Sequence, residues 1–412
     1  MTDSKEKTLY LFTNEFPYGN SETYLESEIP VLVDQFDKVY LFPSIRKISG
    51  HKRLLPEKFE VVVLNTDWVK QRNKLLFKNF VFIAATLFNE YKFISNKRTF
   101  FKNFKMLKNK LLHRLYLSEQ LEIVLLEKKV TNSIFCSYWF SDSVILLGIL
   151  KKQGVINSFV SRAHGFDIYD NRNEDGYIPF RYFQLKMVDR VFSVSNKGKQ
   201  YLKSKKAFPE KVETSYLGVA DLGENPFNES EIYTIVSCSN VNIFKRIDLI
   251  VEILKHLSFP VNWIHFGDGD QLENIKEQSK ALPDTIHVDF KGRVANSEVM
   301  DFYKNNTVHL FITTSAMEGL PMTLIEAASF GIPLMGTNVG GIPEIINDTT
   351  GLLIPEKVDV IAVAKLIDDF LISDKNSKQF RGKVKGFWKE NFEAIKNYND
   401  FYDRVQGVQK NN

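Results

Sequence analysis

Two carboxylates eight residues apart, Glu318 and Glu326, form the pattern in this chain that is most informative about chemistry. The first lies in a turn broken by glycine and proline, and the second lies inside the apolar-patterned helix that follows. A strand-like run, Val308–Ile312, comes directly before the turn. This strand–loop–helix order predicts backbone N–H groups and a helix N-terminus beside a carboxylate. Such a site suits a ligand with a diphosphate at one end and hydroxyl groups at the other.

Two other interpretations of this pair are open: a solvated helix start, and the acid and nucleophile of a glycosidase. Eight residues of helix span roughly 12 Å, whereas a retaining glycosidase holds its two carboxyls about 5 Å apart. A clamp therefore fits better, with one carboxylate accepting hydrogen bonds from a sugar and the other from a ribose diol. Because Pro321 has no N–H group, the backbone donors expected for the diphosphate belong to Gly319, Leu320, Met322 and Thr323.

A basic pair, Lys245-Arg246, follows a strand and an irregular loop and precedes a helical pattern that starts at Ile247. A cation in this position joins a helix N-terminus, and both stabilise the negative charge that develops on a departing nucleotide diphosphate. The alternative is an ordinary surface pair, since the chain has 54 Lys and Arg residues. The strand before the pair favours the functional interpretation.

Three further positions could carry chemistry. His164 ends a strand-like run and precedes a glycine, which is typical of a binding position in an open α/β sheet, although a lone histidine is as often a core residue. The run Asp268–Asp270 has the spacing of a metal-binding Asp-x-Asp, but a glycine turn explains it, and we expect no metal site. Arg293 and Val294, after the strand that ends at Phe290, are expected to contact a base through their backbone.

The composition is that of an ordinary globular protein of two domains. The 412 residues are 44% hydrophobic and 25% charged, with a net charge of +4. Two cysteines are too few for a disulfide framework or a zinc site and fit a reducing compartment. The N-terminus has no apolar signal core, and the longest apolar run, Leu75–Phe88, is too short and too charged to span a bilayer. We expect a cytoplasmic protein, or one that lies at the inner face of the cell membrane.

Short β-rich runs alternate with helical patterns from end to end, which predicts parallel, doubly wound α/β units. The expected strands are Thr8–Thr13, Val39–Phe42, Glu60–Leu64, Ser133–Ser137, Phe159–Ala163, Arg190–Val194, Val212–Tyr216, Tyr233–Ser237, Trp263–Phe266, Ile286–Phe290, Val308–Ile312 and Pro333–Gly336. A turn-rich, aperiodic segment over 218–230 is typical of a linker. We therefore expect an N-terminal acceptor-binding domain over 1–217, a C-terminal nucleotide-sugar-binding domain over 231–388, and a helix over 389–412 that packs back on the N-terminal domain.

Positive charge is concentrated in one stretch, Lys70–Arg114, which holds twelve Lys or Arg residues, one acid and nine aromatic residues. Five apolar residues recur there at helical spacing: Phe100, Phe104, Leu107, Leu111 and Leu115. This period predicts a face packed on the sheet, with the lysines on a solvated face. The same charge excess suits an anionic membrane surface, at about 1 kcal/mol per basic residue. Both interpretations stay open, and because no nucleic-acid-binding signature accompanies the charge, we expect no nucleic acid as a partner.

Three motifs together resemble a known enzyme family: Glu318-x7-Glu326, Gly340-Gly341-Ile342-Pro343-Glu344, and Asn240 followed by Lys245-Arg246. They are similar to those of the retaining, nucleotide-sugar-dependent glycosyltransferases of GT-B fold, and within those to glycosyltransferase family 4. The resemblance runs from about Ile232 to Leu353 and is looser in the N-terminal half. Two departures are that Asn240 stands where many members carry an arginine, and that the first loop offers only Gly19 where many have paired glycines.

The resemblance implies a role for each matching residue. Glu326 matches the glutamate that holds the ribose hydroxyls, and Glu318 matches the one that faces the transferred sugar. Lys245 matches the basic residue that neutralises the diphosphate, and His164 matches a histidine near the donor sugar. Other donor contacts are expected from Arg246, Asn240, Gly319, Leu320, Met322, Thr323, Arg293 and Val294, and the acceptor-side loop is expected to contain Gly19, Asn20 and Glu22.

The implied fold is two Rossmann-like doubly wound domains that face each other across a cleft, with the C-terminal helix crossing back to the N-terminal domain. The implied activity is that of a retaining, metal-independent hexosyltransferase without a cofactor. It would move a sugar from a nucleotide-diphosphate sugar, UDP favoured over GDP, to a hydroxyl of a saccharide or lipid-linked saccharide in capsule, O-antigen or exopolysaccharide assembly. A nucleotide-sugar epimerase of the same architecture and a catalytically silent sugar-nucleotide-binding protein remain alternatives.

Overall fold

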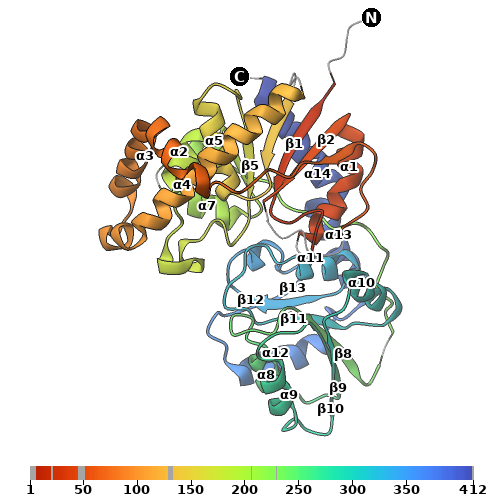
Figure 1. Ribbon diagram of the computed structural model, residues 1–412. Helices are drawn as coiled ribbons and strands as arrows, with labels where there is room; N and C mark the ends of the chain where they lie inside the picture. The colour runs from red at the N-terminus through yellow and green to blue at the C-terminus, as the bar shows by residue number, and fades with distance from the viewer. Residues whose placement is uncertain are drawn as a thin grey trace, which may run out of the picture. The chain divides into compact units, whose positions relative to one another are not determined.

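The computed structural model describes residues 6–19, 22–44, 52–128, 133–205, 207–228 and 230–410, and the chain divides into two compact units (Figure 1). The first unit combines Met1–Ser215 with Tyr398–Asn412, and the second is the continuous segment Tyr216–Asn397. The chain therefore passes from one unit to the other twice.

The first unit is built on a seven-stranded parallel sheet with the order β3-β2-β1-β4-β5-β6-β7. Its strands are β1 Thr8–Thr13, β2 Lys38–Pro43, β3 Phe59–Val61, β4 Ser133–Ser137, β5 Val160–Ala163, β6 Arg190–Ser193 and β7 Val212–Thr214. All six residues of β1 are buried, as expected for a central strand that is covered on both faces.

Helices fill the connections between these strands: α1 Ile29–Gln35, α2 Arg72–Lys78, α3 Phe80–Phe93, α4 Lys97–Glu127, α5 Asp142–Lys152, α6 Arg181–Met187 and α7 Asn196–Ser204. Short 3₁₀ helices are η1 Thr23–Glu28, η2 Val69–Gln71, η3 Asp170–Arg172, η4 Glu174–Gly176 and η5 Pro209–Lys211. The connection from β3 to β4 contains three α-helices, although one crossover helix is enough to join parallel neighbours. The 31-residue α4 packs against α5, and α3 packs against α4 and α6.

The second unit has a six-stranded parallel sheet with the order β10-β9-β8-β11-β12-β13, which is the Rossmann strand order. Its strands are β8 Tyr233–Cys238, β9 Val261–Phe266, β10 Ile286–Gly292, β11 Leu310–Thr313, β12 Leu334–Thr337 and β13 Gly351–Ile354. Its helices are α8 Ile247–Leu254, α9 Leu272–Ser279, α10 Asn296–Asn305, α11 Met322–Ser329, α12 Val360–Leu371, α13 Lys378–Asn391 and the 3₁₀ helix η6 Ile342–Glu344. Helices α8, α9 and α12 cover one face of the sheet, and α10, α11 and α13 cover the other (Figure 1).

The last helix, α14 (Ala394–Lys410), begins in the second unit and packs on the first. The Tyr402 hydroxyl donates to Glu28 Oε2 at 2.6 Å, and Glu28 Oε1 forms an ion pair with Arg162. Both charged side chains are fully buried, so each depends on the other and on its hydrogen bonds for compensation of its charge. The expectation that the C-terminal helix returns to the N-terminal domain is confirmed.

The segment expected to be a linker, 218–230, lies within the second unit. Its Asn225 is buried: the side-chain amide donates to the Asn306 carbonyl at 2.8 Å, and the side-chain oxygen accepts from Val308 N at 3.0 Å. The Arg381 guanidinium donates to the same oxygen at 2.7 Å. Asn225 therefore connects the segment to Asn306, Val308 and Arg381 of the second unit. The turn-rich composition predicted a linker, but the segment is bonded to the unit.

The expected parallel α/β architecture is confirmed, and two local expectations need correction. Strand β13 was not expected. It pairs so closely with β12 that a Cβ at Gly351 would lie 1.7 Å from the Leu334 carbonyl oxygen. Glycine is required there by the strand contact, whereas the sequence suggested a turn. Phe104, expected on the packed face of its helix, is 42% exposed, whereas Phe100 and Leu107 are buried. Within the described parts of the chain, no helix has the length and apolar character needed to cross a membrane.

Candidate functional site

The second unit has its topological switch point between β8 and β11, which pair in parallel at the centre of the sheet. The chain leaves β8 toward the helices of one face and leaves β11 toward those of the other, so the two loops separate and leave a crevice. Ligands of open α/β sheets bind in such a crevice. The loop after β8 carries Lys245, and the loop after β11 carries Glu318.

Lys245 and Glu318 form an ion pair at this switch point. The Ser315 hydroxyl donates to the same Glu318 oxygen at 2.7 Å, and Glu318 is only 9% exposed. Asn242 positions the lysine, because its side-chain oxygen accepts from the Lys245 N–H at 3.2 Å and thereby closes a turn. Sequence reasoning predicted both charged residues but not Ser315, whose only signal was a polar residue just after an apolar strand.

Arg246, expected to contact the donor, binds the protein backbone instead. Its Nε donates to the Thr314 carbonyl at 2.7 Å, and its two terminal nitrogens donate to the Ser315 and Glu356 carbonyls at 3.2 and 3.1 Å. Its backbone is left-handed, with φ at 48°. The guanidinium therefore fixes the loop after β11, and its role as a donor contact stays a prediction.

The glycine pair Gly340-Gly341 explains why the downstream motif accompanies the Glu318 turn. A Cβ at Gly340, where φ is +53°, would lie 2.0 Å from the Glu318 carbonyl oxygen. The Gly341 N–H donates to the Gly319 carbonyl at 2.8 Å. Only glycine permits this approach, so the pair holds the turn that presents the Glu318 carboxylate.

Glu326 lies on α11, half-buried, and accepts a hydrogen bond from the Asn296 amide at 2.9 Å. Burial raises the pKa of its carboxyl to about 7, and the bond from Asn296 opposes that rise only in part. The sequence carried no signal for Asn296, because the two residues belong to helices thirty residues apart.

Helix α11 begins at Met322, so the N–H groups of Met322 and Thr323 lie in its first turn, where amides have no intrahelical partner. Leu320 has a buried side chain, and the Gly319 carbonyl is occupied by the bond from Gly341. Asn240 and Arg293 are exposed, and Val294 is half-buried. The structure thus joins Lys245, Ser315 and Glu318 by direct bonds, and Glu326 with Asn296, while no bond links Asn240 or Arg293 to these groups among the described residues.

In the first unit, the equivalent switch point lies between β1 and β4 and holds Glu22. The buried Glu22 carboxylate accepts from the backbone N–H groups of Asn14, Glu15 and Phe16 at 3.0, 2.7 and 2.7 Å, and from Trp139 Nε1 at 2.5 Å. These bonds fix the loop after β1. Gly19 lies in that loop at φ +67°, and Asn20 lies outside the described residues.

His164 follows β5 and is buried in a box of aromatic rings formed by Tyr24, Tyr138 and Trp139, with ring centroids 5.8, 5.2 and 4.3 Å away. Asp167 lies 3.7 Å from its Nδ1 and accepts the His164 backbone N–H at 2.6 Å. Neither ring nitrogen has a hydrogen-bond partner among the residues that the structure describes. A buried imidazole with unbonded nitrogens calls for a functional explanation.

The Asp268–Asp270 run is a glycine turn that packs closely on the loop after β8. A Cβ at Gly267, where φ is +140°, would lie 1.8 Å from the Ser239 carbonyl oxygen, and one at Gly269 would lie 2.3 Å from that of Val241. Close backbone contact therefore accounts for both glycines. In the described ranges, no three His, Cys, Asp or Glu side chains gather in a group that could hold a metal ion.

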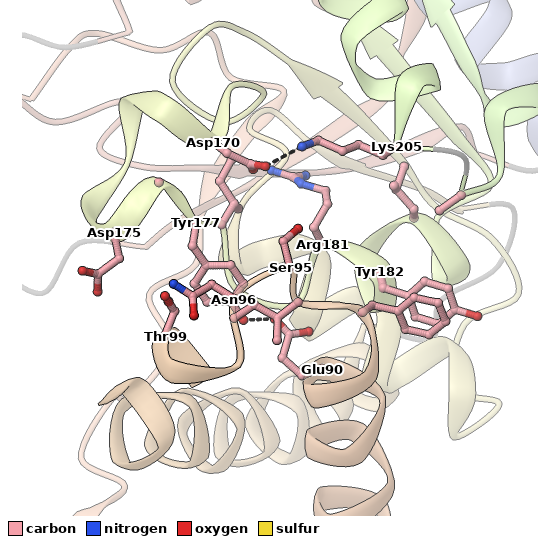
Figure 2. A pocket seen from close by; sticks show the side chains of 16 residues that line it. Glu90, Ser95, Asn96, Thr99, Asp170, Asp175, Tyr177, Arg181, Tyr182 and Lys205 are labelled. Carbon is pink, nitrogen blue, oxygen red and sulfur yellow. Dashed lines mark hydrogen bonds and ion pairs between the residues drawn. The ribbon is translucent and has the colours of Figure 1, made fainter. Parts of the chain in front are cut away.

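A separate cavity of about 190 Å³ lies in the first unit, beside the turn between α3 and α4 (Figure 2). Its charged groups are compensated within the protein: Lys205 pairs with Asp170 at 2.5 Å, and the buried Glu90 accepts from Tyr177 and from the Phe180 N–H. None of the residues predicted to bind the donor or acceptor lines it, although part of the basic stretch Lys70–Arg114 does. We treat this cavity as part of the scaffold.

Two Rossmann-type parallel sheets in one chain, with a charged site at the switch point of the second, define the GT-B class of fold. A solved structure from Anabaena, described as Alr3699/HepE in complex with UDP-glucose, has this fold, with a TM-score of 0.63 over 98% of this chain and 100% of that one at 12% identity. Residues 223–386 match the family model described as Glycosyl transferases group 1. The matched segment is less than half of the chain and contains all three motifs, so this match agrees with the resemblance to glycosyltransferase family 4.

Curated relatives match parts of the chain. It is 27% identical over 238 residues to a phosphatidylinositol N-acetylglucosaminyltransferase subunit of Arabidopsis thaliana, covering 54% of this chain and 51% of that protein. It is 32% identical over 146 residues to the O-antigen biosynthesis glycosyltransferase WbnH of Escherichia coli, covering 35% and 40%. The chain thus spans about half or less of the length of these two relatives.

Proposed function

We propose that the protein transfers a sugar from a UDP-sugar to a hydroxyl group of a saccharide acceptor, with retention of configuration at the anomeric carbon. The observation that carries this proposal is the Lys245–Glu318 ion pair at the switch point of the second unit, next to the first turn of α11. A cation, a carboxylate and unpaired helix amides together match a ligand that is anionic at one end and hydroxylated at the other.

Lys245 and the first-turn amides of α11 stabilise the diphosphate as the glycosidic bond breaks. A bound diphosphate competes with Glu318 for Lys245. Glu318 then stays held by Ser315 and can accept a hydrogen bond from a hydroxyl of the donor sugar. We assign Glu326 to the ribose diol and His164, on the first unit, to a sugar hydroxyl.

No side chain acts as a nucleophile in this mechanism. The bond from the anomeric carbon to the phosphate oxygen breaks while the bond to the acceptor oxygen forms on the same face. The departing phosphate oxygen takes the acceptor proton, so charge and protons balance without a metal ion or a cofactor. The bond from Ser315 to Glu318 supports this mechanism, because it holds the carboxylate in place as a hydrogen-bond acceptor for the donor sugar.

The choice of UDP is supported by the Anabaena structure, which is described as holding UDP-glucose. The E. coli relative is named for O-antigen biosynthesis, which supports an acceptor in cell-surface polysaccharide assembly. We infer the donor and the acceptor from similarity to these two proteins. Lys245, Ser315 and Glu318 are the polar groups proposed to bind the donor.

Thermal shift and turnover measurements test the proposal together. UDP and UDP-glucose are expected to raise the melting temperature more than GDP does, and Glu326→Ala is expected to remove most of the rise. Transfer to a saccharide acceptor should follow in a donor-dependent assay. The proposal fails if no nucleoside diphosphate stabilises the protein, or if the donor is converted to an isomer without an acceptor.

A further inference from the structure

Helix α3 is apolar on the face that it buries and also on the face that it exposes. Ile83 and Leu87 are buried against the rest of the unit, whereas Val81 is 80% exposed and Phe88 is 67% exposed. Phe77, at the end of α2, is 84% exposed. A surface helix of a globular domain normally has polar residues on its outer face, so this outer face requires a partner.

Topology shows that α2 and α3 are additions to the fold. The long α4 already provides the crossover from β3 to β4 and packs on α5, and α3 packs on α4 and α6 as an outer layer. The exposed phenylalanines are therefore not a by-product of covering the sheet. Clusters of exposed apolar side chains of this kind mark interaction surfaces.

Exposed basic residues lie on the same three helices, α2, α3 and α4, as these apolar side chains. We define the α2–α4 surface as the exposed residues Lys74, Phe77, Phe80, Val81, Phe88, Lys92, Phe101, Lys102, Phe104 and Lys105. Lys102 pairs with Asp175 at 2.5 Å, whereas Lys74 and Lys105 form no ion pair with any residue in the described part of the chain. Exposed phenylalanines, together with exposed lysines of which Lys74 and Lys105 have no ion-pair partner in the described residues, combine the two features of a peripheral membrane-binding surface.

The surface is held rigidly. Glu90 on α3 (Figure 2) accepts the Phe180 N–H at 2.7 Å. Lys97 at the start of α4 donates to the Ile94 carbonyl at 3.0 Å. The first bond anchors α3 to the segment before α6, and the second fixes the corner between α3 and α4. Little conformational freedom remains to be lost when the outer face binds a partner.

We propose that the α2–α4 surface docks this protein on an anionic lipid membrane. The phenylalanines enter the boundary between headgroups and acyl chains, and the lysines contact the anionic headgroups. Charge complementarity favours lipid over a second copy of the chain, because two copies would bring the same lysines together. This inference does not depend on the proposed transferase activity.

Co-sedimentation of the full chain with vesicles tests the proposal. We expect binding to phosphatidylcholine vesicles that contain phosphatidylglycerol, weak binding to pure phosphatidylcholine, and weaker binding at high salt. The double variant Phe80→Ser/Phe88→Ser is expected to lower the partition coefficient more than tenfold. Each of Lys74→Gln and Lys105→Gln is expected to lower it about fivefold, since one basic residue near the surface contributes about 1 kcal/mol.

Matched controls come from the second unit. Ile361→Ser removes an apolar side chain that is 64% exposed on α12, and Lys276→Gln removes an exposed positive charge on α9. Neither control should change vesicle binding by more than twofold. UDP affinity, measured for each variant, should stay at the wild-type value and separates this test from that of the proposed function.

Two results would overturn the docking proposal. One is that wild-type protein does not bind phosphatidylglycerol vesicles, or binds them as weakly as the Phe80→Ser/Phe88→Ser variant. The other is that this double variant changes the oligomeric state in light scattering while vesicle binding stays intact, which would make the surface a protein–protein interface.

Discussion

The two switch points of the molecule share a topology and differ in chemistry. In the second unit, an ion pair between Lys245 and Glu318 stands next to a helix N-terminus. In the first unit, the Glu22 carboxylate at the switch point accepts from the loop after β1 and from Trp139, and His164, after the neighbouring strand β5, has both ring nitrogens without hydrogen-bond partners in the described structure. The same arrangement of parallel strands thus presents an ion pair in one unit and an imidazole ring without hydrogen-bond partners among the described residues in the other.

This difference follows from what surrounds each polar group. Ser315 holds Glu318 and Asn242 holds Lys245. In the proposed mechanism, a diphosphate replaces Glu318 as the partner of Lys245. His164 is enclosed by aromatic rings and has two ring nitrogens without hydrogen-bond partners among the described residues, which suits a hydrogen bond with a hydroxyl group. This difference agrees with the proposed roles of Lys245 toward a diphosphate and of His164 toward a hydroxyl group.

The largest effect is expected for Lys245→Ala. Removing the cation that stabilises the leaving diphosphate should lower kcat by about 10²- to 10³-fold, the usual cost of one lost charge-stabilising donor. Affinity for UDP should fall less, because the first-turn amides of α11 remain. Kinetics with saturating UDP-sugar measure the change, and Lys255→Ala on α8, whose lysine pairs with Glu252, serves as a control. If kcat is unchanged, Lys245 does not stabilise the leaving diphosphate, and the two units do not differ in the way proposed.

His164→Ala is expected to lower kcat/KM by about thirtyfold to a hundredfold while UDP affinity stays constant, because the imidazole serves a hydroxyl and not the nucleotide. The variant His164→Phe keeps the stacking with Trp139 and loses the ring nitrogens. If His164→Phe has wild-type activity, the histidine is a packing residue and the two switch points differ less than the structure suggests.

Glu22→Gln should reduce stability without changing nucleotide binding. The amide group of glutamine would meet the N–H groups of Glu15 and Phe16, which now donate to a carboxylate at 2.7 Å. We expect a loss of about 1–3 kcal/mol in the free energy of unfolding, the range for leaving buried donors unsatisfied. Urea unfolding measures it. A loss of UDP affinity in a stably folded variant would show that this loop does more than support the first unit.

Glu326 gives the smallest effect, a pH dependence of nucleotide affinity. With a folded-state pKa of about 7, raised by burial, the carboxylate is mostly protonated at pH 6 and mostly ionised at pH 8. Only the ionised form accepts two ribose hydroxyls, so UDP affinity should rise about tenfold between these pH values. Glu326→Gln should bind more weakly and lack this increment, which calorimetric titrations of both proteins can test. Parallel pH profiles would show that Glu326 does not hold the ribose.

The raised pKa of Glu326 also makes the stability of the protein depend on pH. Between its unfolded pKa near 4.5 and its folded pKa near 7, the folded state binds more protons than the unfolded state. The contribution of Glu326 to the free energy of unfolding therefore falls as pH rises through this window. Nucleotide binding to the ionised form opposes that fall, so UDP should stabilise the protein more at pH 8 than at pH 6.

Motifs with strict local spacing were predictable from the sequence. The carboxylate of Glu318 follows a strand, and Lys245 opens a helix; parallel strands bring such positions to one edge of a sheet, so their meeting at the switch point agrees with the predicted α/β fold. Most strands were also found within a few residues of their observed ends, because buried parallel strands are continuous apolar runs.

Contacts between distant segments could not be read from the sequence. Arg246 stands next to Lys245, yet its left-handed backbone turns the guanidinium toward three carbonyls, and no sequence pattern distinguishes the two neighbours. Asn225 looked like part of a linker because turn residues serve equally well as connections and as buried hydrogen-bonding hubs. The exposure of the outer face of α3 could not be predicted either, because apolar residues on a helix normally indicate burial in a core.

The double passage of the chain between the units has a consequence for synthesis on the ribosome. The second unit is one continuous segment, Tyr216–Asn397, and has all its strands before the last helix emerges. The first unit begins earlier but lacks the Tyr402 hydroxyl that donates to the buried Glu28 until nearly the whole chain is made. The N-terminal unit should thus be the last to reach its final stability, and a nascent chain halted before Tyr402 should expose it to proteases while the other unit resists them.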